Sequence, residues 1–348
     1  MECHLIKFNY DGNDDDSAIE MAFDENFVEA RKNWIMTGIE ERRQRRENNE
    51  KEIFLYEDIT NRVTYKDFIN KEFILYCIEH NRRSIPSVVD GFKPSQRKII
   101  YTCLNKYCQQ KIKVTELAGI VSQYTAHQHG NHSLPLTIVN MAQRFKNKIN
   151  LLLPIGKFGK DAASPRYLST ILSPITRKIF PELDDPLLTY QRDDQEIEPD
   201  YYVPIIPMVL VNGSEGIGTG WSTKVPKNDP IKIVDIIKKM IYGEEPVKLI
   251  EELNHTSSMV MFDKSGNIKQ YNSASEILKE FAAIRLSYYE RRRQSYQDAK
   301  TLWLNELDDF LREYNSQAQE PMDEDTDVDD EDYSDDDDDD VFLPSSKY

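Results

Sequence analysis

The stretch RSIPSVVDGFKPSQRK, residues 83–98, lies between two predicted helices and sets the plan of the chain. Upstream of it, apolar residues from Phe68 to Cys77 have the spacing of an amphipathic helix. Pro94 suits the first position of the next helix, which continues past Tyr101. Two more helical segments and a strand-rich segment follow at residues 114–124, 133–145 and 152–172. Four helices followed by strands predict an α+β fold with a winged-helix domain.

Farther downstream, a connector rich in Pro and Asp (173–204) leads into an apolar run and then into NGSEGIGTG, residues 212–220. Closely spaced glycines of this kind are typical of tight backbone turns. Residues 230–242 predict a helix and residues 259–271 a hairpin. Ser273 and Glu276 fit a capping box that begins a long helix, packed either in a core or in a coiled coil.

Upstream of the quoted stretch, residues 11–16 (DGNDDD) predict an exposed acidic turn. Residues 17–49 then predict a helix that ends in the basic cluster ERRQRR, residues 41–46. The cluster is either a solvated helix face or a patch for nuclear localisation or phosphate contact.

The net charge of −17 is concentrated near the C-terminus. Between Glu320 and Asp340 lie 15 of the 61 acidic residues and no Lys or Arg, so the other 46 nearly balance the 44 basic residues. We therefore expect a disordered acidic tail on a near-neutral folded part, which can still carry a basic face. The four cysteines form no CxxC pair, so the sequence indicates neither a zinc site nor a disulfide scaffold. Without a membrane-length apolar run or a signal peptide, the chain is expected to be soluble and intracellular.

Taken singly, the candidate chemical motifs are weak. GIGTG at residues 216–220 lacks the spacing of a dinucleotide-binding G-x-G-x-x-G motif. His127, His129 and His132 have neither HExxH spacing nor cysteine partners, so no metal site is predicted. One tyrosine among 19 is ordinarily a core or surface residue.

Four segments in one order change this interpretation. They are the stretch 83–98, the pair His129-Gly130, DAASPRY at 161–167, and PIIPMVLVNG at 204–213 running into EGIGTGWS at 215–222. Together they resemble the DNA breakage–reunion core of eukaryotic-type type IIA DNA topoisomerases, from about residue 24 to residue 289. The resemblance implies a nuclear homodimer that passes one DNA duplex through a double-strand break in another, using ATP and Mg²⁺.

The resemblance implies that Tyr167 is the nucleophile, forming a 5′-phosphotyrosine that keeps the bond energy for religation. A phenol, with an ordinary pKa of about 10, needs assistance near neutral pH. Arg166 would supply a fixed cation for charge on the phosphoryl oxygens, with a simple phosphate contact as the alternative. Arg97 and His129 are the implied second contributors, His129 by handling a proton or binding phosphate.

Three further residues are implied contacts with double-stranded DNA. Lys93 and Lys98 lie in the stretch 83–98. Ile217 matches the family's apolar residue that wedges between base pairs and bends the duplex, with core packing as the alternative.

The sequence departs from the family pattern in four places. Neighbours of His129 differ, and part of the loop before the tyrosine is missing after Gly159. Nothing resembles the ATPase domain or the acidic Mg²⁺-binding motifs, and most of the tower and the dimerising C-gate is missing. We therefore expect a fragment, splice product or gene remnant without an ATP or metal site of its own. A non-catalytic DNA-binding remnant, or a fragment that interacts with topoisomerase subunits, is the alternative to a cleaving enzyme.

The expected domain organisation has five parts. They are a helical remnant preceding the core (1–60), a winged-helix breakage–reunion domain (61–182), a partial tower (183–272), a long helix or truncated coiled-coil arm (273–316), and the acidic tail (317–348). The tail is expected to compete with DNA for the basic face, to bind basic proteins such as histones, or only to aid solubility.

Overall fold

The structure, a computed structural model, describes residues 6–51, 53, 55, 62–107, 110–126, 133–192, 196–244, 253, 258–292 and 299–319. His129 and residues 320–348 of the predicted acidic tail lie outside these residues, whereas residues 317–319 belong to a helix. No helix in these ranges is long and apolar enough to span a bilayer.

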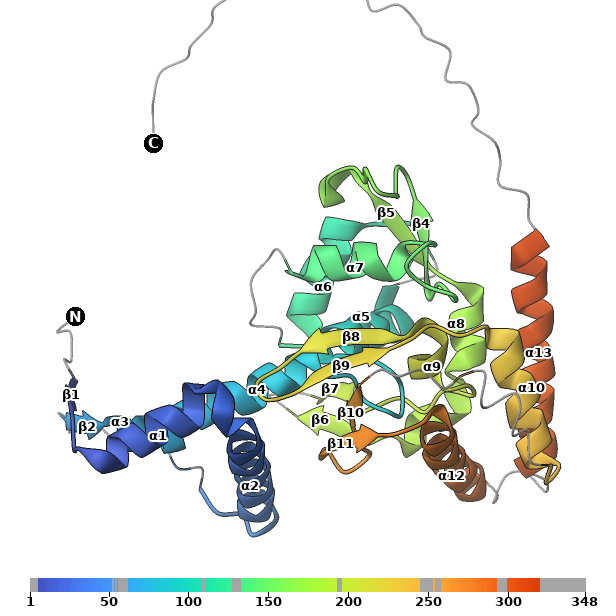
Figure 1. Ribbon diagram of the computed structural model, residues 1–348. Helices are drawn as coiled ribbons and strands as arrows, with labels where there is room; N and C mark the ends of the chain where they lie inside the picture. The colour runs from blue at the N-terminus through green and yellow to red at the C-terminus, as the bar shows by residue number, and fades with distance from the viewer. Residues whose placement is uncertain are drawn as a thin grey trace, which may run out of the picture.

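The N-terminal arm, residues 6–84, projects from one side of the molecule (Figure 1). Its two short strands pair in parallel, and its helices pack around a small core of Ala18, Ala22 and Ile69. The elements are β1 (Lys7–Asn9), α1 (Asn13–Phe23), a 3-10 turn (Glu25–Phe27), α2 (Val28–Glu47), β2 (Arg62–Thr64), α3 (Tyr65–Phe68), a π-helical turn (Ile69–Phe73) and α4 (Ile74–Ser84).

The acidic residues near the N-terminus begin a helix, so the predicted exposed turn at 11–16 is wrong. Asp15 is fully buried, and its carboxylate accepts hydrogen bonds from the backbone N–H groups of Asp11 and Lys66, both at 2.7 Å. Carboxylates near a helix N-terminus complement the helix dipole, which explains why this run starts α1. The helix predicted over 17–49 is interrupted at Asp24, whose side chain accepts from the N–H of Asn26 at 2.8 Å.

The described part of the winged-helix lobe, residues 94–172, has three helices and a three-stranded antiparallel sheet of order β3-β5-β4. The predicted winged-helix arrangement is confirmed, and α6 spans the residues that the sequence predicts. Pro94 is the first residue of α5, as expected. The elements are α5 (Pro94–Thr102), a π-helical turn (Cys103–Tyr107), β3 (Ile112–Lys113), α6 (Val114–Tyr124), α7 (Ser133–Ala142), β4 (Leu152–Ile155), a 3-10 turn (Pro165–Tyr167) and β5 (Ser169–Leu172).

The central region, residues 173–271, packs beneath this lobe through one continuous hydrophobic core. Phe180 contacts Phe92 on one side and Tyr202 on the other, with ring centroids 5.6 and 5.4 Å apart. The predicted hairpin over 259–271 is confirmed. The elements are α8 (Pro174–Ile179), a 3-10 turn (Glu182–Leu187), β6 (Tyr190–Arg192), β7 (Glu196–Pro199), α9 (Met208–Asn212), β8 (Ser214–Ile217), β9 (Ser222–Val225), α10 (Pro230–Ile241), β10 (Met259–Phe262) and β11 (Ile268–Tyr271).

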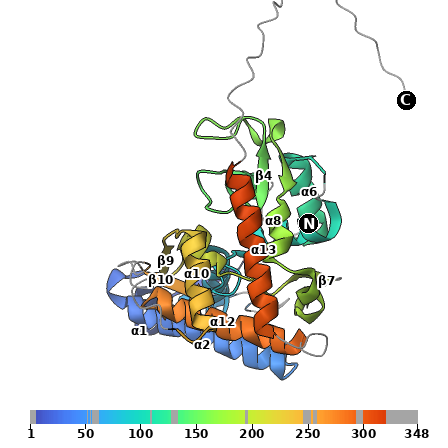
Figure 2. The same ribbon diagram turned by 90° about the vertical axis from the view of Figure 1, so that its right-hand side faces the viewer.

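The C-terminal part has two helices, α12 (Ala274–Arg292) and α13 (Ala299–Gln319), where the sequence predicts one. Helix α13 lies beside α8 and α10 (Figure 2). Trp303 is buried and its indole N–H donates to the carbonyl of Ile205 at 2.9 Å. The apolar stripe of the long helix is therefore a contact with the core rather than a coiled-coil seam.

A group of charged side chains, here called the charge clasp, joins these two helices to the central region. Arg285 and Arg292 of α12 both pair with Asp184 and with Glu306 of α13. The Arg292–Asp184 and Arg285–Glu306 distances are 3.1 and 3.2 Å, and the hydroxyl of Tyr289 also donates to Glu306. Both arginines and Asp184 are buried, so each charge depends on its partners for the solvation that water would otherwise provide.

Candidate functional site

Tyr167 lies on the 3-10 turn between β4 and β5, the two strands of the wing. Its N–H donates to the carbonyl of Ser164 at 2.9 Å, and the next residue, Leu168, is buried in the core. Pro165 begins the turn with its backbone φ already fixed. The side chain of Tyr167 is nevertheless 72% exposed. The wing thus holds the backbone in place and presents the phenol to solvent.

Arg166 accompanies the phenol. Its guanidinium carbon lies 5.7 Å from the centroid of the Tyr167 ring, and the side chain is exposed. An exposed, permanent cation beside the ring is available to an anionic phosphate. The arrangement suits either of the two roles expected for Arg166.

Ile217 lies at the end of β8 in the hairpin with β9 and is 78% exposed, so the core-packing alternative is wrong. The turn is held by Asn81 of α4, whose amide accepts from the N–H of Thr219 at 2.8 Å and donates to its carbonyl at 3.1 Å. A Cβ atom on Gly216 or Gly218 would lie 2.0 Å from an oxygen of Ser84 or Asn81. The glycines therefore allow the hairpin to approach α4, a role that the sequence motif alone did not reveal.

Lys93 connects the start of α5 to the same hairpin. Its ammonium donates to the carbonyl of Glu215 at 2.7 Å, and burial lowers its pKa. A Cβ atom built on Gly216, the residue before Ile217, would lie 3.3 Å from this ammonium nitrogen. In this arrangement the ammonium supports the hairpin.

Arg97 is buried and engaged by the protein's own residues, and its implied contribution beside the DNA stays a prediction. The guanidinium makes two bonds to Asp90, at 2.7 and 3.1 Å, and a third to the carbonyl of Phe92 at 3.3 Å. Arg97 is only 6% exposed and Asp90 is fully buried. The pair fixes the turn before α5, and Asp90 also accepts from the N–H of Tyr202 at 3.0 Å.

Lys98 is likewise occupied by internal partners. Its ammonium lies 2.7 Å from the buried carboxylate of Glu198 and donates to the carbonyl of Thr125 at 2.5 Å. Thr125 follows the last turn of α6. Lys98 thus joins α5, α6 and β7. Its ammonium is engaged by these internal partners, and the DNA contact expected of Lys98 stays a prediction.

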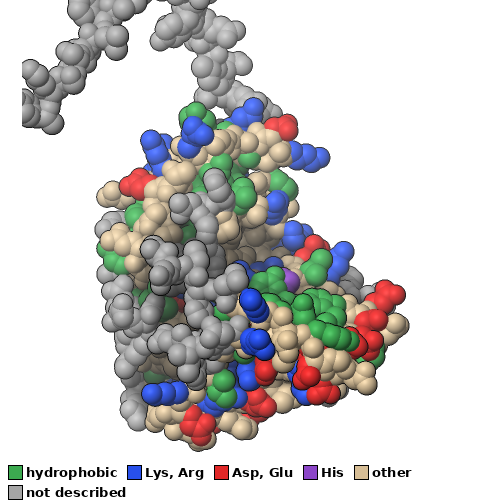
Figure 3. Space-filling view, turned by 90° about the vertical axis from the view of Figure 1, so that its left-hand side faces the viewer, with side chains coloured by type: hydrophobic (Ala, Val, Ile, Leu, Met, Phe, Trp, Pro, Cys, Tyr) green, Lys and Arg blue, Asp and Glu red, His purple; other side chains and the backbone are tan. Residues whose placement is uncertain are grey.

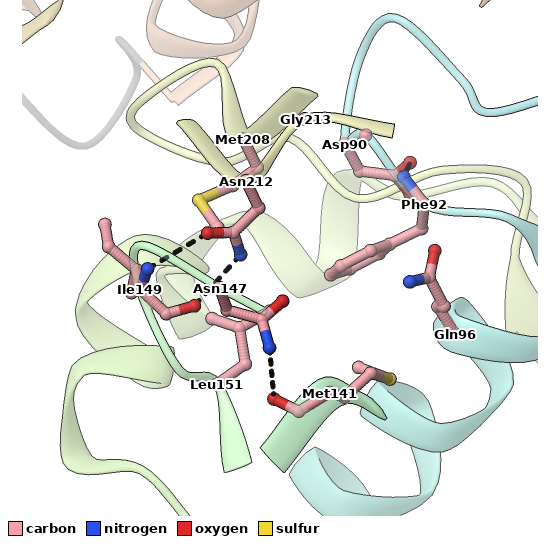
Figure 4. A pocket seen from close by; sticks show the side chains of 11 residues that line it. Asp90, Phe92, Gln96, Met141, Asn147, Ile149, Leu151, Met208, Asn212 and Gly213 are labelled. Carbon is pink, nitrogen blue, oxygen red and sulfur yellow. Dashed lines mark hydrogen bonds between the residues drawn. The ribbon is translucent and has the colours of Figure 1, made fainter. Parts of the chain in front are cut away.

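A pocket lies beneath the turn that Arg97 fixes, between α5, α9 and the chain leading into β4 (Figure 4). Its amides are already engaged. Asn212 accepts from the N–H of Ile149 at 3.0 Å and donates to its carbonyl at 2.9 Å, while Asn147 donates to the carbonyl of Met141 at 3.2 Å. The pocket is a junction between the winged-helix lobe and the central region, without a cluster of reactive groups.

The basic cluster of α2 forms ion pairs along its own helix. Arg43 pairs with Glu40 at 2.5 Å and Arg45 with Glu41 at 3.5 Å. These pairs favour the solvated-face alternative over a phosphate-contacting patch. Among the described residues, no group of His, Cys, Asp and Glu could hold a metal ion.

The segment that contains the wing, residues 110–172, carries a stronger net positive charge than the basic cluster of α2. Between residues 110 and 172 the chain has eight Lys or Arg and two acidic residues, Glu116 and Asp161. Figure 3 shows Lys and Arg side chains on the upper part of the molecule, and all eight residues of this segment are exposed. We call this set the basic lobe; it consists of Lys111, Lys113, Arg144, Lys146, Lys148, Lys157, Lys160 and Arg166. A local count of charge in the sequence finds this set, of which only Arg166 lies in a family motif.

Comparison with known proteins places these features in a family. Residues 83–255 match the family model of the A-type subunit of DNA gyrase/topoisomerase IV, and residues 1–81 match the C-terminal associated domain of TOPRIM. The chain is 51% identical over 255 residues to DNA topoisomerase 2-beta of Gallus gallus, covering 71% of this chain and 16% of that protein. It is 42% identical over 333 residues to DNA topoisomerase 2-alpha of Mus musculus, covering 92% of this chain and 20% of that protein.

A solved structure is similar over most of the chain. It is the Plasmodium falciparum topoisomerase II DNA-binding, cleavage and re-ligation domain, with a TM-score of 0.67 and 30% identity over 83% of this chain and 53% of that one. The chain thus spans about a fifth or less of the curated relatives it matches. The two family models meet near the end of α4, at the start of the stretch RSIPSVVDGFKPSQRK, residues 83–98. On these matches, the chain belongs to the eukaryotic-type type IIA DNA topoisomerases, the DNA topoisomerase II family.

Proposed function

We propose that this chain is the DNA breakage–reunion part of a nuclear type IIA topoisomerase, binding duplex DNA through the basic lobe and cleaving it with Tyr167. The observation that carries the proposal is the presentation of Tyr167, 72% exposed on an anchored turn with Arg166 beside its ring. The exposed Ile217 supplies a second contact, because an apolar side chain on a hairpin can enter between base pairs and bend the duplex.

The reaction exchanges one phosphate ester for another. The phenol oxygen of Tyr167 attacks the DNA phosphorus, the bond from phosphorus to the 3′ oxygen breaks, and the departing 3′ oxygen takes up a proton. The phenol proton goes to a base, for which His129 is the proposed candidate. Arg166 stabilises the charge that develops on the phosphoryl oxygens. Reversal restores the DNA without a new energy source, because the ester bond is conserved.

Arg97, Lys98 and Lys93 are proposed to act through other groups. Each holds a segment of the site in place: the turn before α5, the end of α6 and the β8–β9 hairpin. Mg²⁺ and ATP belong to the family's reaction, and the described residues offer no cluster that fits the metal. We propose that cleavage requires a polypeptide that carries the family's acidic metal-binding motifs, in a dimeric assembly.

The first prediction concerns the covalent bond. With such a polypeptide and Mg²⁺ supplied, the chain should form a denaturant-stable adduct at the 5′ end of labelled duplex DNA, and Tyr167→Phe should form none. Tyr242→Phe is the matched control, because Tyr242 is also exposed, at 69%, but lies after α10. Gel separation after denaturation measures the adduct. Adduct that persists in Tyr167→Phe would exclude Tyr167 as the nucleophile. An intact chain that binds duplex but never forms adduct would favour the non-catalytic alternative.

A further inference from the structure

The basic lobe carries a net positive charge that its own residues do not neutralise. Its eight Lys and Arg are exposed and face only two acidic residues of the same segment. In α2, by contrast, the half-buried Arg43 and Arg45 pair with glutamates one turn away. Uncompensated like charges on one lobe repel each other and attract an anionic occupant.

The same chain contains an anionic segment that matches this lobe. Residues 320–340, which we call the acidic segment, hold 15 carboxylates and no Lys or Arg. They follow directly after α13, which ends at Gln319. Both views of the fold show the C-terminal end of α13 at the same end of the molecule as the wing strands β4 and β5 (Figures 1 and 2).

The starting point of the acidic segment is fixed by the packing of α13. The helix is anchored because three of its residues are buried in the main core, namely Trp303, Leu307 and Phe310. A chain extends by roughly 3.3–3.6 Å per residue, so a segment of this length reaches up to about 70 Å. Tethering a ligand in this way raises its effective concentration at the lobe to about the millimolar range.

We propose that the acidic segment occupies the basic lobe when DNA is absent, and that a duplex must displace it to reach Tyr167. The inference rests on the proposed function, since it assigns a regulator to the DNA-binding face. Carboxylates spaced along an extended chain resemble the phosphates of a DNA strand in charge. Arg166 belongs to the basic lobe, so the occupied state also shields the proposed nucleophile.

The regulation that follows depends on ionic strength. Screening weakens the contact between segment and lobe as the Debye length falls from about 30 Å at 0.01 M salt to about 10 Å at 0.1 M. Duplex binding is itself weakened by salt, with a log–log slope of about −0.9 per phosphate contacted. Added salt therefore has two opposing effects: it releases the acidic segment from the basic lobe, and it weakens the attraction of the duplex to the same lobe. Duplex affinity should consequently depend less on salt in the native chain than in a chain without the acidic segment's charge.

The test compares full-length chains that differ only in tail charge. One variant replaces all 15 carboxylates of the acidic segment by Asn or Gln, and a second keeps the composition of residues 320–340 in scrambled order. At about 0.02 M salt the neutral variant should bind a short duplex about tenfold more tightly than the native chain. The advantage should shrink to less than about twofold at 0.3 M salt. The scrambled variant should behave as the native chain, because the attraction depends on charge and not on sequence.

A measurement without DNA separates this inference from the proposed function. A carbodiimide joins carboxylates directly to nearby lysine amines, so the acidic segment should link to Lys113, Lys148 and Lys157 rather than to Lys7 or Lys66 of the N-terminal arm. Links spread evenly over both sets would overturn the inference, as would equal duplex affinity of native and neutral chains at low salt. In either case the proposed function would stand. A neutral chain without salt-dependent duplex binding would instead overturn the proposed function.

Discussion

Arg97 and Arg166 are two arginines of one lobe with opposite surroundings. Arg166 is exposed beside a tyrosine ring, whereas Arg97 is buried with both of its strong hydrogen bonds made to Asp90. The fork of a guanidinium matches a carboxylate as well as it matches a phosphate, so residue type alone does not distinguish these roles. What distinguishes them is access to solvent, which depends on the turn between Val88 and Phe92.

Replacing Arg97 should therefore affect stability more than DNA contact. Arg97→Ala leaves Asp90 buried without its partner, which we expect to lower the free energy of unfolding by about 3–5 kcal/mol. Arg43→Ala is the control, since its pair with Glu40 is exposed and should cost less than about 1 kcal/mol. Urea unfolding followed by circular dichroism measures both. An Arg97→Ala chain of native stability, with a reduced salt slope of duplex binding, would restore Arg97 as a phosphate contact.

Among the elements, the β8–β9 hairpin depends on how closely it approaches α4. A methyl group on Gly216 would meet the backbone oxygen of Ser84 at 2.0 Å, and backbone cannot rotate away as a side chain does. The hairpin would have to shift, and Ile217 would move with it. The position of Ile217 is thus determined by Gly216 and Gly218, which lack a side chain.

Gly216→Ala should cost about 1–3 kcal/mol of stability through overpacking and reduce the bend of a bound duplex, measured by energy transfer between dyes at its ends. Gly119→Ala is the matched control, because a methyl group there meets nothing within 4 Å and α6 gains a better helix former. A bend that is unchanged in Gly216→Ala but lost in Ile217→Ser would show that the wedge tolerates displacement.

Some elements of the fold can be predicted from sequence patterns, and others cannot. Helix α6, the start of α5 at Pro94 and the β10–β11 hairpin follow local signals, namely apolar periodicity, proline position and turn residues. The packing of α13 depends on a contact with a residue 98 positions away, and the burial of Arg97 depends on a partner across a turn. Such tertiary contacts leave no periodic trace in one sequence. The exposed positions of Tyr167 and Ile217 agree with the roles that motif order implies, but exposure itself comes from the fold.

At the scale of the whole molecule, buried tyrosines couple stability to alkaline pH. Burial raises the pKa of Tyr202, Tyr271 and Tyr289 above the ordinary value of about 10. The folded state therefore keeps phenol protons that the unfolded state releases. Their contribution to stability is fully present below about pH 10 and is lost as the pH rises above that value.

The expected outcome is a steep loss of stability above about pH 10, with phenolate absorbance of the buried tyrosines appearing together with unfolding. Tyr271→Phe removes one of these groups, so the free energy of unfolding should fall less steeply with pH than in the native chain. Urea unfolding at several alkaline pH values gives the slopes. Equal slopes for the two chains would mean that Tyr271 ionises as readily in the folded state as in the unfolded one.

The charge clasp has a consequence for the order in which the molecule is made. Asp184 precedes its partner Arg285 by 101 residues, and Ile205 precedes Trp303 by 98. At about 5–20 residues per second, a ribosome delivers the partner roughly 5–20 s after the residue that waits for it. During that interval the winged-helix lobe has all of its own elements, while the face that α13 later covers is open to chaperones. Helix α13 is synthesised after α8 and α10, the helices it packs against, so the central region reaches its final packing only after α13 has emerged.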